Sequence, residues 1–93
     1  MGLQAGAVSQ DDAAPSEINR IFQARVMWYN RMAGYGFMAL DGFPRDVFVH
    51  NTAVRAGDVP RDYLLKNDEL TCKVGLREGR PCCIDLVMVR AAG

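Results

Sequence analysis

Residues 25–50 of this 93-residue chain read RVMWYNRMAGYGFMALDGFPRDVFVH and contain three short runs of apolar and aromatic residues. The runs are Val26–Tyr29, Gly34–Met38 and Val47–His50, and residues typical of turns separate them. β-Branched and aromatic residues favour strands, whereas Asp, Gly and Pro favour turns. The stretch therefore predicts three consecutive strands of an antiparallel meander.

The rings in this stretch follow the two-residue period of a strand. Successive side chains of a strand point to opposite faces, so Tyr35 and Phe37 share one face, as do Phe48 and His50. The aliphatic residues on the opposite faces can be buried. A sheet face that carries several exposed rings is typical of single-stranded nucleic-acid binding, because flat bases stack on flat rings.

The order and spacing of the three runs resemble those of the cold-shock domain family. Gly34-Tyr35-Gly36-Phe37-Met38 resembles the first ribonucleoprotein motif of that family, and Val47-Phe48-Val49-His50 resembles the second. Trp28-Tyr29-Asn30 resembles the Trp-Phe-Asn of its first strand. The resemblance continues through Asn51–Val54 and covers roughly residues 24–89. Three motifs in register are a specific signal, whereas a single Gly-x-Gly is a weak one.

The pattern along the whole chain predicts an all-β fold. We expect strands at about residues 22–29, 35–40, 46–50, 69–76 and 82–90, and a short helical turn at 51–55 capped by Asn51 or Thr52. Five short strands without a crossover helix indicate a five-stranded antiparallel barrel of the OB type, which the resemblance also implies. In the fifth strand we expect Ile84, Leu86 and Met88 inside, and Cys83, Asp85 and Val87 outside.

The chain divides by composition into a leader and a domain. Residues 1–20 offer little to bury and are expected to be a disordered acidic leader, followed by the barrel at 21–91. The first nineteen residues carry Asp11, Asp12 and Glu17 and no Lys or Arg, so the remainder is mildly basic although the formal net charge is zero. The spacing of Ile18, Ile21 and Phe22 suggests one helical turn docked at the edge of the domain.

Several classes of protein are disfavoured by the sequence. The three cysteines are an odd number without a Cys-x-x-Cys spacing, so we expect reduced thiols in a cytoplasmic protein and no metal site. The chain lacks an apolar run of membrane-spanning length and a secretory signal. We find no nucleophile–base pair or paired carboxylates, so we expect neither an enzyme nor a cofactor. The expected state is a monomer or a weak dimer.

The resemblance implies a stacking surface made of Trp28, Tyr35, Phe37, Phe48 and His50. Trp28 and Tyr29 are adjacent, so strict alternation exposes only one of them, and the family pattern favours Trp28. A purely structural histidine is the alternative for His50. The candidates for phosphate or base-edge contacts are Arg25, Asn30, Arg31 and Arg80, with solvated surface residues as the alternative.

The chain departs from the family pattern at the rim of this surface. Met27 and Ala33 stand where cold-shock domains usually have Lys, and Asn51 and Val59 stand where they usually have rings. The resemblance implies a binder of single-stranded RNA or DNA that acts as an RNA chaperone or modulates transcription or translation, and these losses suggest weakened binding. The alternative is a protein-interaction module, for example on RNA polymerase or a ribosomal factor.

Overall fold

The computed structural model describes residues 20–92, so the predicted leader lies almost wholly outside the described residues. The described elements are β1 (Phe22–Asn30), β2 (Tyr35–Leu40), β3 (Val47–His50), α2 (Asn51–Ala56), β4 (Glu69–Arg77) and β5 (Arg80–Arg90). The prediction of an all-β fold is confirmed, and the bounds agree with those expected to within two residues. Among residues 20–92, no helix has the length and apolar character needed to cross a membrane.

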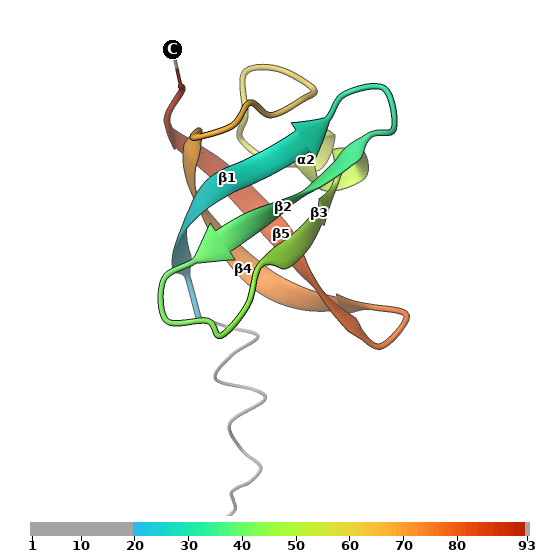
Figure 1. Ribbon diagram of the computed structural model, residues 1–93, viewed down its shortest axis with the longest axis vertical. Helices are drawn as coiled ribbons and strands as arrows, with labels where there is room; N and C mark the ends of the chain where they lie inside the picture. Colours follow the sequence, from blue (N-terminus) through green and yellow to red (C-terminus); the bar gives the residue numbers. More distant parts are fainter. Residues whose placement is uncertain (1–19, 93) are drawn as a thin grey trace, which may run out of the picture.

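The five strands close into a barrel in the order β1-β2-β3-β5-β4, and β4 pairs back with β1. The predicted OB-type barrel is thereby confirmed. Neighbouring strands are antiparallel except β3 and β5, which run parallel and share a single register pair, Phe48 with Cys82. Figure 1 shows β1, β2 and β3 forming one wall, with β4 and β5 crossing behind it. A closed barrel buries one face of every strand and leaves the other face to solvent.

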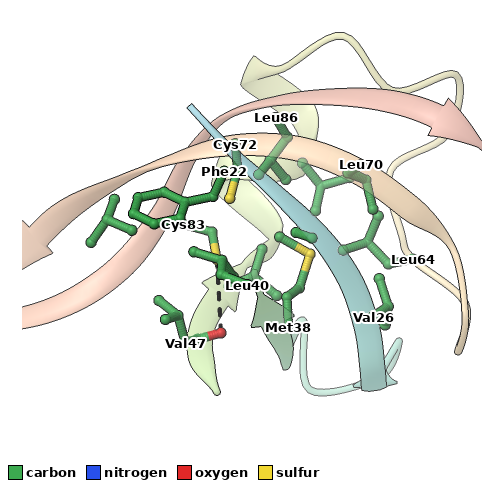
Figure 2. Close-up of a cluster of buried hydrophobic side chains, with 14 residues drawn as sticks. Phe22, Val26, Met38, Leu40, Val47, Leu64, Leu70, Cys72, Cys83 and Leu86 are labelled. Carbon is green, nitrogen blue, oxygen red and sulfur yellow. Dashed lines mark hydrogen bonds between the residues drawn. The ribbon is translucent and has the colours of Figure 1, made fainter. Parts of the chain in front are cut away.

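The core is built from the inward-facing residues of all five strands. Val26, Met38 and Val49 are fully buried, and Leu64 from the loop before β4 joins them (Figure 2). Burial of each such aliphatic side chain contributes about 1.5–3 kcal/mol to folding. A long hydrogen bond of 3.8 Å from the Cys83 thiol to the Val47 carbonyl links β5 to β3. The inner face of β1, β2 and β3, which carry the motif residues, therefore packs on a continuous apolar core.

The predicted inward and outward directions of the first side chains of β5 are wrong. Cys83 is buried and Ile84 is half-buried, whereas the sequence predicted the reverse. Asp85 has a positive φ of 53°, and the register with β4 shifts between the pairs Thr71–Val87 and Lys73–Ile84. A bulge of this kind inserts a residue and reverses the alternation, so Cys83 and Leu86 both point inward.

The first described residues differ from the predicted helical turn. Ser16–Asn19 lie outside the described residues, but Phe22 is buried as the first residue of β1, and Ile21 is exposed. The Phe22 ring packs edge-to-face on Phe43 of the β2–β3 turn, with centroids 5.6 Å apart. The stripe predicted from Ile18, Ile21 and Phe22 is wrong for the two residues that are described, because Phe22 is buried in a strand and Ile21 is exposed to solvent.

The loop before β4 is fixed by one buried carboxylate. Asp68 has no exposed side-chain surface and accepts hydrogen bonds from the Arg61 guanidinium, at 2.9 and 3.1 Å, and from the backbone N–H groups of Leu65 and Ala92. Burial alone would raise the pKa of Asp68, but these hydrogen bonds outweigh it and hold the pKa below its usual value. Through these hydrogen bonds Asp68 holds Arg61, the loop before β4 and the end of the described chain in fixed positions.

Candidate nucleic-acid interface

The five predicted ring residues lie together on the outer face of β1, β2 and β3. We call this set the ring platform; it comprises Trp28, Tyr35, Phe37, Phe48 and His50. Their positions follow from the strand register, which places Trp28 opposite Phe37, Phe37 opposite Phe48, and Tyr35 opposite His50. Cross-strand neighbours on one face are close enough for their side chains to touch.

The ring platform is continuous from β1 to β3. Phe37 lies 5.5 Å from Trp28 and 5.9 Å from Phe48, measured between ring centroids. Tyr35 stacks on Phe48 at 5.8 Å with an interplanar angle of 29°, and His50 follows Phe48 at 6.2 Å. Trp28 is 44% exposed and Tyr35 37% exposed, while the other three rings are half-buried by their neighbours. Each ring therefore supports the next and still presents surface to solvent.

A bulge in β1 turns Trp28 outward. Val26 pairs with Met38 and Trp28 pairs with Phe37, so Met27 is an extra residue in β1. Without that extra residue, alternation from the buried Val26 would point Trp28 into the core. The prediction that Trp28 faces outward is therefore matched by the geometry.

Tyr29 packs against the core beside this bulge. Its hydroxyl has no hydrogen-bond partner among the described residues, and burial raises the pKa of the Tyr29 phenol. Of the adjacent pair Trp28 and Tyr29, only Trp28 belongs to the ring platform.

Gly36 allows β1 and β2 to approach closely beneath the rings. A Cβ atom at this position would lie 2.2 Å from the Trp28 carbonyl oxygen and 2.7 Å from the Tyr29 Cα atom. Both neighbours are backbone atoms, which cannot move aside without breaking the pairing of the two strands. The glycine between Tyr35 and Phe37 is therefore a steric requirement of the platform, and it adds no flexibility there.

His50 has two roles in the structure. Its ring continues the platform beyond Phe48, and its Nδ1 atom caps α2 by accepting a hydrogen bond from the Thr52 backbone N–H at 3.2 Å. The sequence predicted Asn51 or Thr52 as the cap, and that prediction is wrong. The turn into α2 begins one residue earlier, where His50 is still extended, with φ of −107° and ψ of 154°.

Three of the predicted polar residues lie on β1 and on the turn that follows it. Arg25 is exposed on β1, opposite Ala39 and Glu69. The Asn30 side chain accepts a hydrogen bond from the Ala33 N–H at 2.9 Å and so closes the β1–β2 turn. Arg31, on the same turn, lies 3.8 Å from the centre of the Tyr63 ring, a cation–π contact with the loop before β4.

Arg80 lies at the start of β5 and borders the rings together with two arginines that the sequence patterns did not predict. Arg45 of the β2–β3 turn, Arg77 of β4 and Arg80 line one hollow with Phe37 and Phe48. The hairpin turn beside Arg77 and the Asp-Gly turn before Arg45 are visible in the sequence. Only the barrel topology brings the two turns together, so the sequence alone did not indicate the cluster.

The fold and this surface define a class: a small OB-type barrel with rings displayed on its second and third strands. No family model matches the chain. The chain is 31% identical over 62 residues to the cold shock-like protein CspA of Rickettsia typhi, covering 67% of this chain and 86% of that protein. The chain belongs to the cold-shock family.

Two longer relatives match the same domain. The chain is 35% identical over 63 residues to Y-box-binding protein 1 of Xenopus laevis and 37% identical over 58 residues to human Y-box-binding protein 3. These alignments cover 63% and 62% of the chain. The chain spans only 20% and 15% of the length of these relatives, so the similarity concerns one domain of each.

Proposed function

We propose that this barrel binds single-stranded RNA or DNA by stacking bases on the ring platform. The observation that carries the proposal is the unbroken row of rings from Trp28 to His50 on one solvent-facing wall. Each base stacked on such a ring contributes about 1–3 kcal/mol, and every base has a flat face that can stack. Sequence preference should accordingly be slight.

Stacking on the platform excludes base pairing of the same nucleotides. A bound strand is held open, which is the physical basis of an RNA chaperone and of a modulator of transcription or translation.

Binding is proposed to be weaker than is usual in the family. Met27 and Ala33 replace two rim cations, and each lost phosphate contact lowers the salt slope of single-strand binding by about 0.7. Asn51 and Val59 replace two rim rings; neither residue can stack on a base as an aromatic does. Only the central rings remain to stack bases, so the proposed site accommodates few nucleotides.

The test is a fluorescence titration of Trp28, the single tryptophan of the chain, with short oligonucleotides at low salt. A single strand should quench the emission, and the same sequence as a duplex should not. The double substitution Phe37→Ala, Phe48→Ala should abolish quenching while the far-UV circular dichroism stays that of a β-barrel. No quenching of the unchanged protein at near-millimolar strand concentrations would remove the proposal, and unfolding of the double variant would show that these rings are core.

A protein-binding role is the second candidate, and one observation favours it. Val87 and Val89 are 42% and 63% exposed on the outer face of β5, away from the rings. Exposed apolar side chains in a row are typical of a partner surface. A partner that stays bound after nuclease treatment and is lost in Val87→Asp, Val89→Asp would support this role; loss of the partner with nuclease would contradict it.

A further inference from the structure

A cationic hollow adjoins the ring platform at its β3 side. It measures about 480 Å³, within the range of sites for small ligands. Phe37 and Phe48 form part of its wall, and Arg45, Arg77 and Arg80 stand around it. The pairing of Phe48 with Cys82 places the beginning of β5 directly beside the platform. A strand stacked on Phe48 would therefore have its backbone next to this hollow.

Two of these arginines face each other across the β4–β5 hairpin. Arg77 is the register partner of Arg80, and the two-residue turn Glu78-Gly79, with φ of 52° and 79°, joins them. Like charges directly opposite each other in a sheet repel and destabilise the pairing. Among residues 20–92, neither these two arginines nor Arg45 lies within salt-bridge distance of a carboxylate. An anion between the two guanidinium groups would remove the repulsion.

Charge distinguishes the hollow beside β3 and β5 from the hollow at β1 and β4. The hollow described above has three arginines against Asp46 and Glu78, an excess of one positive charge. The other hollow, at β1 and β4, has Arg25 against Asp41 and Glu69, and Glu69 is already paired with Arg90, so this hollow has no excess of positive charge. A phosphodiester carries one negative charge, so it is attracted to the first hollow and gains no such attraction at the second.

We propose that Arg45, Arg77 and Arg80 form a phosphate-binding subsite that holds the phosphodiester next to a base stacked on Phe48. One end of the bound strand then leaves the platform across β5 and the β4–β5 hairpin. The inference rests on the proposed function and adds a fixed path to it. Figure 1 shows the geometry that permits this path: the β2–β3 turn, which carries Arg45, and the β4–β5 hairpin extend from the same end of the barrel.

The test compares two charge-matched double variants, one at the β4–β5 hairpin and one far from it, at Lys66 in the loop before β4 and Arg90 at the end of β5. Arg77→Gln, Arg80→Gln removes the facing pair, whereas Lys66→Gln, Arg90→Gln removes two cations near the beginning of β4, where Arg90 pairs with Glu69. Binding of a single-stranded hexanucleotide is measured over a range of salt concentrations. The first variant should lower the salt slope by about 0.7, the value for one phosphate, and the second should leave it unchanged.

A second arm locates the phosphate. Hexanucleotides with one neutral methylphosphonate linkage, moved along the strand, should show one position that weakens binding to the unchanged protein and has no effect on Arg77→Gln, Arg80→Gln. Equal salt slopes for the two double variants, or a penalty that persists in the arginine variant, would overturn the subsite while leaving the platform intact. If the unchanged protein bound no oligonucleotide at all, the proposed function and the subsite would fail together.

Discussion

Trp28 lies opposite Phe37 across β1 and β2, with ring centroids 5.5 Å apart and ring planes inclined by 47°. Neither ring belongs to the buried core, although both strands contribute to it. The barrel therefore contains two kinds of ring: buried rings that stabilise the fold, and rings that lie on its outer face. Substitutions should separate the two kinds.

Phe37→Leu should weaken oligonucleotide binding about 5- to 150-fold, because one stacking ring contributes about 1–3 kcal/mol. Its cost in unfolding free energy should stay below about 3 kcal/mol, because Phe37 takes part in two aromatic pairs that contribute at most about 1.5 kcal/mol each. Phe22→Leu is the control, since Phe22 is a buried ring on the inner face. It should lower the melting temperature and leave affinity unchanged while the protein is folded. The reverse pattern would place Phe37 in the core.

Substitutions of His50 should separate its stacking role from its capping role. His50→Asn keeps a side chain that can cap α2 and removes the ring, so affinity should fall and stability should change little. His50→Phe keeps a ring and removes the cap, so the unfolding free energy should fall by about 1 kcal/mol with affinity retained. Chemical denaturation and the Trp28 titration measure the two effects. Equal behaviour of both variants would refute the dual role.

Asp68→Asn should destabilise the protein by about 3 kcal/mol, because it leaves the Arg61 guanidinium without its buried ionic partner. Glu69→Gln, which disrupts the exposed pair with Arg90, should cost less than about 1 kcal/mol. Urea denaturation of both variants at neutral pH provides the comparison. Similar midpoints would show that Asp68 contributes no more than a surface charge.

The same carboxylate should make stability depend on acid pH. Because the pKa of folded Asp68 lies below its unfolded value, its contribution is complete above the unfolded pKa of about 4 and disappears as the pH falls through the folded pKa. The unchanged protein should therefore lose stability below about pH 4 more steeply than Asp68→Asn. Melting temperatures between neutral pH and strong acid measure the difference. Parallel curves would contradict this assignment.

Gly36→Ala should cost about 3 kcal/mol or more, because the added methyl group would overlap the backbone of β1. Gly79→Ala is the matched control: Gly79 has φ of 79°, but no other atom lies within 4 Å of the place that an added methyl group would take. Only the cost of the left-handed backbone, about 1 kcal/mol, is therefore expected there. Thermal denaturation of the two variants distinguishes steric overlap from backbone strain. A milder effect at Gly36 than at Gly79 would contradict the close approach of β1 and β2.

Sequence patterns predicted the platform wall because its strands alternate regularly and are joined by short turns. Tyr35, Phe37 and Phe48 could be assigned to one face by counting residues in twos. The same count failed in β5, where the bulge at Asp85 turns the Cys83 side chain inward. The residue types around Asp85 did not indicate a bulge. Trp28 also lies behind a bulge, and only the family pattern placed it outward.

The sequence alone could not predict contacts between turns that are far apart along the chain. Arg45 and Arg77 are 32 positions apart, and the closure of the barrel brings both to the edge of Phe48. The cap of α2 was missed for a different reason: Asn and Thr are the usual capping residues, and here the imidazole of His50 replaces them. In both cases the tertiary arrangement of the strands decided the contact.

The single register pair between β3 and β5 makes this join the narrowest of the barrel. Amide groups along such a join exchange their hydrogens with solvent through small openings that leave the remaining strands paired. A nucleic-acid strand that lay on Phe48 and reached Arg80 would span the join and hold its two sides together. Ligand binding should therefore suppress these local openings. Slower hydrogen exchange of the β3 amides would then measure the fraction of protein that has a ligand bound.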